Sequence, residues 1–276
     1  MPELPEVETT RRGLMPHAVR HVITKVVVRN PRLRWPVDKL VSSAPCGQTI
    51  LQLDRRGKYL ILVCENGSLI VHLGMSGSLR IVSANMPANP HEHLDIVLDN
   101  HMALRLRDPR RFGAVLWHTG DSLDHPLLAK LGIEPLSTGF DADYLYHLTR
   151  CRTAIKSLLM DSRRIAGIGN IYANEALFYA GLHPETSAQH LTPEIALRLV
   201  SSIRDTLTRA IAAGGSSLRD FVGSEGQPGY FQQQYAVYGR TGLPCLYCGH
   251  LIQHIKQSQR SSFFCPKCQE IQRQTV

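Results

Sequence analysis

Residues 59–73 read Tyr-Leu-Ile-Leu-Val-Cys-Glu-Asn-Gly-Ser-Leu-Ile-Val-His-Leu, and this stretch decides the fold of the first half of the chain. Two apolar runs flank Asn66-Gly67, a dipeptide that favours the tight turn of a β-hairpin. Similar strand character recurs in residues 22–28, 94–98, 102–107 and 114–117. Short strands separated by turn signals predict an antiparallel sandwich or barrel.

The pattern changes to a helical period in the second half of the chain. Residues 119–140 contain several glycines and prolines, which indicates a connecting region. The helices expected after it are one from Ala142 capped by Asp141, one over residues 153–160, one over 170–180 closed by Gly181, and one from Pro193 to Gly214-Gly215. The fold class is therefore α+β, with an all-helical region after the β-rich half.

Composition limits the function classes. The chain has 276 residues and a net charge of +8, which favours a polyanionic partner such as nucleic acid. No apolar run approaches the roughly 20 residues of a membrane helix, and the acidic start does not resemble a signal peptide. Seven cysteines, an odd number, indicate a reducing compartment. We therefore expect a cytoplasmic protein without a membrane partner.

The C-terminal cysteines form the strongest local signal. Cys245 and Cys248 make one C-x₂-C pair, and Cys265 and Cys268 make a second pair 16 residues later. Four thiolates at this spacing predict one closed, structural zinc site rather than an iron–sulfur cluster. The surrounding residues are basic, so the finger is expected to contact phosphates, although a purely structural role is the alternative.

The chain begins Met1-Pro2-Glu3-Leu4-Pro5-Glu6. Removal of Met1 would leave Pro2 with a secondary amine, which can attack an acetal-like carbon such as C1′ of a nucleotide and form an iminium ion. Glu3 could act as general acid or base. A helix is expected from Pro5 to about Arg12, ended by Gly13. On these residues alone, a solvated tail is the simpler interpretation.

Five further segments carry candidate nucleic-acid contacts. Gly167-Ile168-Gly169-Asn170 precedes a helix, where free N–H groups suit a phosphate. The turns around Met75 and Phe112 could insert side chains between bases, although buried core anchors are the simpler interpretation. Lys58 opens a strand, where it is a base contact or a solvated charge. The loop over residues 222–230 could close over a site or be an ordinary surface loop.

Together, these segments resemble the formamidopyrimidine-DNA glycosylase family, bacterial base-excision enzymes for oxidised purines. The resemblance rests on PELPEVET, RRGKYL, HLGMSGSLR, DPRRFG, GIGNIYANEALF, GQPGYF and QRSSFFCPKC, in this order along nearly the whole chain. It implies a β-sandwich catalytic domain (1–130), a linker region (131–150), a helix–two-turn–helix DNA-binding domain (151–237) and a zinc finger (238–276), with DNA in the cleft between them.

The resemblance also implies roles for individual residues in a bifunctional glycosylase and AP lyase that nicks the strand by β,δ-elimination. The implied catalytic residues are Pro2 as the Schiff-base nucleophile, Glu3 as acid/base, Lys58 for lesion contact and β-elimination, and Arg260 for δ-elimination. The implied DNA contacts are His91, Arg110, Arg152, Asn170, Met75 and Phe112. Cys151 stands where the family pattern leads us to expect a basic residue, and the adjacent Arg152 keeps a positive charge.

Two other functions fit part of the sequence. An endonuclease VIII-like glycosylase for oxidised pyrimidines usually has Gly where this chain has Leu4. A non-catalytic zinc-finger DNA-binding protein would not need Pro2, Glu3 and Lys58 together. The expected partner is therefore double-stranded DNA with oxidised purines or abasic sites, bound by a monomer that holds one structural Zn²⁺.

Overall fold

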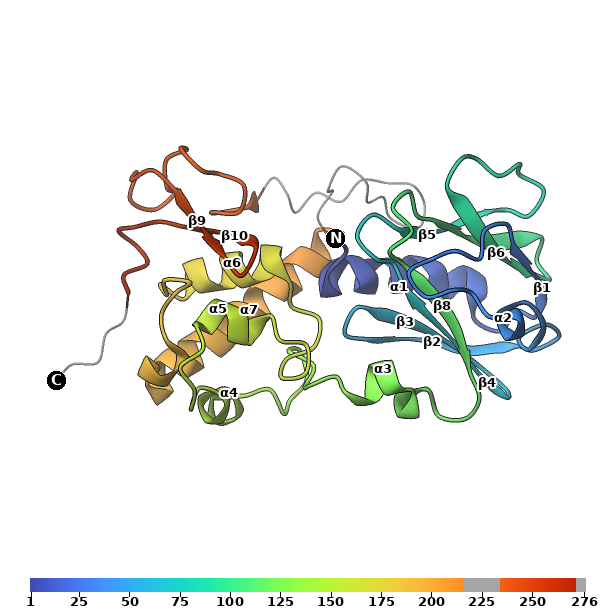
Figure 1. The fold of residues 1–276 in the computed structure, drawn as a ribbon, viewed down its shortest axis with the longest axis horizontal. Coiled ribbons are helices and arrows are strands. Elements are labelled where there is room, and N and C mark those ends of the chain that lie inside the picture. The colour runs from blue at the N-terminus through green and yellow to red at the C-terminus, as the bar shows by residue number, and fades with distance from the viewer. Residues whose placement is uncertain (216–233, 272–276) are drawn as a thin grey trace. The chain divides into compact units, whose positions relative to one another are not determined.

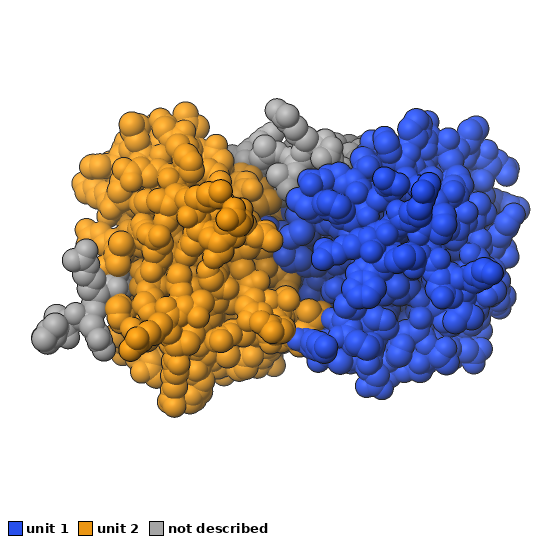
Figure 2. Space-filling model, viewed as in Figure 1, with its two compact units in different colours: residues 1–130, 211–232 blue, residues 131–210, 233–276 orange. Residues whose placement is uncertain are grey.

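The computed structural model describes residues 1–215 and 234–271, and the chain divides into two units (Figures 1 and 2). Unit 1 contains residues 1–130 and 211–232, and unit 2 contains residues 131–210 and 233–276. The domain limits expected from the sequence stay a prediction. In the described residues, no helix is both long and apolar enough to cross a membrane.

Unit 1 contains two four-stranded antiparallel sheets, as the sequence predicted. The first has the order β1-β6-β7-β5 and the second the order β2-β3-β4-β8. Their strands are β1 (Ile23–Val28), β2 (Ile50–Arg56), β3 (Tyr59–Cys64), β4 (Gly67–His72), β5 (Ser78–Ser83), β6 (Glu92–Leu98), β7 (Met102–Arg107) and β8 (Ala114–His118). One hydrophobic core takes side chains from both sheets, for example Leu62 and Ile96, so each sheet packs one face into this core.

The β3–β4 hairpin is present, but its turn is shifted by one residue from the expected position. Cys64 pairs with Gly67, so the two loop residues are Glu65 and Asn66. Gly67 begins β4 with φ +149°, and a Cβ there would lie 2.4 Å from the carbonyl oxygen of His118. Glycine is therefore required by the close approach of β8, which the local sequence does not reveal.

Helix α1 (Leu4–Ala18) does not end at Gly13, so that prediction was wrong. Leu14 and Ala18 beyond the glycine are fully buried in the core of unit 1. A glycine inside a helix costs about 1 kcal/mol, whereas burying one leucine side chain contributes about 2 kcal/mol. Packing against the sheets therefore outweighs the local stop signal.

Strands β2 and β5 were missed by the sequence analysis, and they share one property. Each is an edge strand of its sheet. The other two edge strands, β1 and β8, were predicted because they keep apolar runs (VVV and AVLW), whereas β2 and β5 carry polar side chains within the strand and lack such a run. Helix α2 (Lys39–Ser43), also missed, has only Val41 buried.

Unit 2 contains the expected helices. Asp141 caps α4 (Ala142–Leu148) by accepting a 2.8 Å hydrogen bond from the N–H of Tyr144, and Gly181 with φ +66° follows α6. The remaining helical elements are α5 (Ile155–Leu159), α6 (Asn170–Tyr179), η2 (Ala188–His190) and α7 (Pro193–Ala212); η1 (Ser122–Asp124) and α3 (Pro126–Ala129) precede them in unit 1.

The C-terminal finger of unit 2 is a β-hairpin with a small core of its own. Strands β9 (Gln253–Gln257) and β10 (Arg260–Phe264) are joined by Ser258-Gln259, both with positive φ. Ile252, Cys245 and Cys265 form this core with Phe178 of α6 and residues 236–237. The finger is thus packed onto α6 as well as held by its cysteines.

Candidate functional site

The first residues of the chain are part of the folded core of unit 1. Pro2 is buried, and Glu3 is only 2% exposed. Glu3 is the N-cap of α1, and its N–H donates a 2.8 Å hydrogen bond to the Glu6 carboxylate, as in a capping box. The simpler interpretation of a solvated tail is therefore wrong. The positive end of the α1 dipole lies beside Pro2 and Glu3, where it favours a carboxylate and disfavours an ammonium.

Lys58 lies in a two-residue hairpin loop rather than at the start of a strand. Arg56 pairs with Tyr59, which leaves Gly57 and Lys58 between β2 and β3, and Gly57 has φ +56°. The pKa of His72 is lowered to about 4, mainly by burial and then by the positive charges of Lys58 and Arg34. The positive charge of Lys58 thus acts on the imidazole at the end of β4.

Met75 and Phe112 are exposed side chains on adjacent turns of unit 1. Each is 40% exposed, so neither is the buried core anchor that the sequence alone favoured. The turns touch through their backbones, because a Cβ at Gly74 would lie 2.5 Å from the carbonyl carbon of Phe112. The guanidinium of Arg110 lies 4.9 Å from the centroid of the Phe112 ring. The structure thus brings these three predicted DNA contacts together.

Asp108 holds these turns in place, and the sequence analysis did not single it out. It is fully buried, and its carboxylate accepts hydrogen bonds from the Gly113 N–H (2.7 Å) and the Ser76 hydroxyl (3.3 Å). Its own N–H donates to the carbonyl of His91 at 2.9 Å. The sequence does contain a hint of this role, because Asp108 stands between a strand end and a proline, and aspartates in turns often accept hydrogen bonds from nearby backbone N–H groups.

In unit 2, Asn170 and Arg260 lie beside each other. Asn170 is the first residue of α6, and Gly169 is the N-cap. The Asn170 amide donates a 3.1 Å hydrogen bond to the carbonyl of Ser261, the residue that follows Arg260. Arg260 itself is exposed at the start of β10. This hydrogen bond therefore joins the start of α6 to the beginning of the finger strand β10.

Lys156 was also missed, because a lysine in an amphipathic stretch is normally solvated. It is 2% exposed, and its ammonium donates to the carbonyl of Ser261 (3.0 Å) and the hydroxyl of Ser262 (2.7 Å). A buried ammonium is tolerated when it is hydrogen-bonded in this way. Lys156 therefore ties α5 to the β10 segment next to Arg260.

The segment before α5 carries the one departure from the family pattern. Arg152 is exposed, as a DNA contact requires. The Cys151 thiol lies 3.8 Å from the guanidinium of Arg164. Burial alone would raise the pKa of Cys151, but hydrogen bonds from Thr153 and the charge of Arg164 lower it. Arg152 and Arg164 thus both place positive charge near Cys151.

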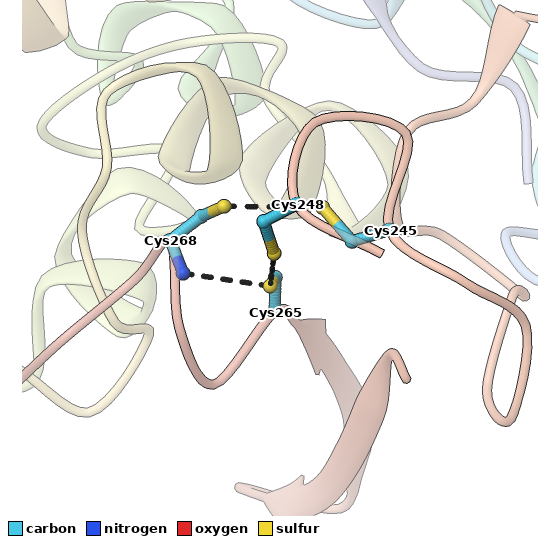
Figure 3. Close-up of side chains that lie close together, drawn as sticks. All are labelled: Cys245, Cys248, Cys265 and Cys268. Carbon is cyan, nitrogen blue, oxygen red and sulfur yellow. Dashed lines mark hydrogen bonds between the residues drawn. The ribbon is translucent and has the colours of Figure 1, made fainter. Parts of the chain in front are cut away.

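The four finger cysteines form the metal site that their spacing predicted (Figure 3). Their Sγ atoms all lie within 4.8 Å of one another; Cys245 and Cys268 are 3.9 Å apart, and Cys248 and Cys265 are 3.4 Å apart. Tetrahedral zinc with Zn–S bonds of about 2.3 Å places sulfurs about 3.8 Å apart. The donor set fits Zn²⁺, and four protein ligands leave no position for water, which makes the site structural.

The predicted loop over residues 222–230 lies within residues 216–233, outside the described part of the chain. The expected DNA cleft between the domains also stays a prediction, because each unit is described by itself.

Three family models match the chain. They are the formamidopyrimidine-DNA glycosylase N-terminal domain over residues 1–115, the formamidopyrimidine-DNA glycosylase H2TH domain over residues 131–222, and a zinc finger found in FPG and IleRS over residues 242–271. The formamidopyrimidine-DNA glycosylase of Aromatoleum aromaticum is 55% identical over 270 residues, which cover 98% of this chain and 99% of that protein.

Solved structures agree along the same length. The MutM (Fpg) protein of Thermus thermophilus is 40% identical with a TM-score of 0.88, covering 98% of this chain and 99% of that one. A Lactococcus lactis FPG mutant bound to DNA containing Fapy-dG is 36% identical with a TM-score of 0.90, covering 98% and 100%. The L. lactis enzyme has also been solved with DNA containing an abasic site.

These matches separate the alternatives that the sequence left open. The relatives named above are formamidopyrimidine-DNA glycosylases, not endonuclease VIII-like enzymes or non-catalytic finger proteins, and the identity extends over nearly the whole chain. The buried N-terminus, the paired turns and the Cys₄ finger are the structural features of the same resemblance. The chain belongs to the formamidopyrimidine-DNA glycosylase family, whose members are bifunctional DNA glycosylases and AP lyases of base excision repair.

Proposed function

We propose that the chain removes oxidised purines, such as 8-oxoguanine and formamidopyrimidines, from double-stranded DNA through a covalent intermediate on Pro2. The observation that carries this proposal is the burial of Pro2 and Glu3 at the start of α1, in the unit that also holds Lys58. A buried amine and carboxylate at a helix N-terminus are placed for chemistry rather than for solvation.

The reaction follows from the properties of the amine. While Met1 is attached, the Pro2 nitrogen is a tertiary amide without an available lone pair, so Met1 must be removed first. The free amine attacks C1′ of the damaged nucleotide, and the bond from C1′ to the base breaks. Glu3 donates and accepts the protons that accompany base loss and sugar-ring opening. The resulting iminium ion acidifies the neighbouring sugar carbon, so elimination of the phosphates nicks the strand.

The other proposed contributions come from residues of both units. Lys58 contacts the lesion and assists β-elimination, and Arg260 binds phosphate and assists δ-elimination. Met75, Arg110 and Phe112 fill the space left by the everted nucleotide, which offsets part of the few kcal/mol that extrusion costs. His91, Arg152 and Asn170 contact the DNA backbone. We further propose that the protein binds DNA as a monomer.

The test is borohydride trapping on duplex DNA with 8-oxoguanine opposite cytosine. We expect a covalent protein–DNA adduct from protein whose mass corresponds to a chain that begins at Pro2. A matched variant, extended by one N-terminal residue that blocks processing, should bind the same DNA and give no adduct. Normal trapping by a chain shown by mass spectrometry to keep Met1 would place the nucleophile elsewhere.

A further inference from the structure

Glu8 in α1 is a buried carboxylate that pairs with three arginine side chains of unit 1. It is 8% exposed and accepts hydrogen bonds from Arg11 (2.9 and 3.0 Å), Arg12 (2.8 Å) and Arg55 (3.2 Å). Burial acts to raise the pKa of Glu8, but the hydrogen bonds from Arg11 and Arg12 and the charges of Arg11 and Arg55 lower it to about 2. The carboxylate is therefore ionised at neutral pH.

The three arginines differ in what else they contact, and Arg11 donates a 3.1 Å hydrogen bond to the carbonyl of Leu53 in β2. The Arg12 side chain is 59% exposed, and its neighbour in this network is Glu8 of the same helix. The Arg55 side chain is 12% exposed and comes from β2. Besides Glu8, Arg55 donates a 3.1 Å hydrogen bond to the carbonyl of Gly57. Arg55 alone of these two therefore links α1 to the loop that contains Lys58.

That loop is short, so the hydrogen bond from Arg55 constrains its orientation. Gly57 and Lys58 are the two loop residues of the β2–β3 hairpin, and Gly57 has the positive φ that favours glycine at the first loop position. The peptide carbonyl that Arg55 holds is the one directly before the Lys58 nitrogen. A rotation of this peptide would move the Lys58 side chain as a whole.

We propose that Glu8 and Arg55 are positioning residues, which hold the Gly57-Lys58 loop in a fixed place relative to the start of α1. Glu8 lies five residues after Glu3 on one helix, about 8 Å along its axis, so Pro2, Glu3 and the loop share a rigid frame. This inference rests on the proposed role of Lys58 in elimination. Displacement of a reacting group by about 1 Å can cost roughly a hundredfold in rate, so a positioning pair has a measurable effect.

The experiment compares Arg55→Met with Arg12→Met. Both substitutions remove a cation that pairs with Glu8, but only Arg55→Met also removes the hydrogen bond from position 55 to the Gly57 carbonyl. Single-turnover strand nicking is measured with saturating duplex that contains an abasic site, and DNA affinity is measured separately. We expect Arg55→Met to slow nicking by about a hundredfold at little-changed affinity. Arg12→Met should stay within about twofold, because exposed ion pairs contribute little.

A double mutant tests whether Arg55 acts through Lys58. Lys58→Met alone should be slow, and adding Arg55→Met should slow it no further, because the positioned group is already gone. Losses that multiply in the double mutant would overturn the inference, as would equal rates for Arg55→Met and Arg12→Met. A normal rate for Lys58→Met would instead show that the proposed role of Lys58 is wrong.

A second variant keeps the test valid if Arg55→Met does not fold. Arg55→Lys retains the charge next to Glu8, but a single ammonium cannot reproduce the planar fork that reaches both Glu8 and Gly57. We expect this variant to melt like the wild type and to nick at a rate between those of the wild type and Lys58→Met. A wild-type rate in folded Arg55→Lys, with Glu8→Gln equally fast, would contradict positioning by this pair.

Discussion

Replacement of Arg105 by Met should destabilise unit 1 and loosen the segment that leads to His91. Arg105 has a side chain that is 3% exposed, and it donates to both oxygens of Asp95 (2.8 Å each) and to Glu92 (3.2 Å). It also donates to the carbonyls of Met86 (2.8 Å) and Pro87 (3.1 Å). These contacts tie β6 and β7 to the loop before His91.

The magnitude follows from what remains after the substitution. Breaking a buried ion pair by removing one partner costs about 3–5 kcal/mol, because a charge is left without its counter-ion. Asp95 keeps a second partner, since Arg29 donates to it at 2.6 and 3.0 Å. We therefore expect the lower end of that range, about 3 kcal/mol of the free energy of unfolding.

The assay is urea denaturation followed by tryptophan fluorescence, with Arg12→Met as the control. Both tryptophans of the chain, Trp35 and Trp117, lie in unit 1, so the signal reports on that unit. The ion pair of Arg12, whose side chain is 59% exposed, should contribute less than about 1 kcal/mol. If Arg105→Met lowered the free energy of unfolding by less than about 1 kcal/mol, this ion-pair network would not stabilise unit 1 as argued. DNA affinity should fall in parallel if the loop carries a DNA contact.

Three further predictions concern the finger, the pH dependence and the exposed turns. Cys265→Ser should lose zinc and DNA affinity while tryptophan-detected unfolding of unit 1 stays unchanged, because metal binding and finger folding are coupled; full zinc content by metal analysis would contradict the ligand assignment. The pKa of His72 is about 4 in the folded protein against 6.5 ordinarily, because of burial and then of Lys58 and Arg34. As the pH falls, His72 is therefore protonated in the unfolded chain before it is protonated in the folded protein. The free energy of unfolding should fall by up to about 3 kcal/mol between about pH 6.5 and pH 4. Coinciding denaturation curves at pH 7 and 4.5 would count against this, and His72→Gln should reduce the pH dependence. Phe112→Ala should reduce discrimination between cytosine and adenine opposite the lesion in nicking assays, with little loss of stability since its ring is exposed; unchanged discrimination would remove it from the void-filling role.

Local signals were sufficient where neighbouring residues supply the structure. The cap at Asp141, the stop at Gly181 and the spacing of the finger cysteines all act within a few residues, and each was found in the expected place. Central strands were equally clear, because burial on both sides demands a continuous apolar run. Edge strands β2 and β5 lack that run and were missed.

The sequence by itself determined the fold class, the metal ligands and the family, because these depend on spacing, periodicity and ordered motifs. Only the tertiary structure showed that Glu8, Asp108 and Lys156 are buried and that helix α1 continues beyond Gly13. Each of these three also has a partner from a distant segment, 32 or more positions away: Arg55 for Glu8, Ser76 for Asp108 and Ser261 for Lys156. Burial of charge costs several kcal/mol unless hydrogen bonds offset it, so such residues are decided by the folded contacts and not by their neighbours in sequence.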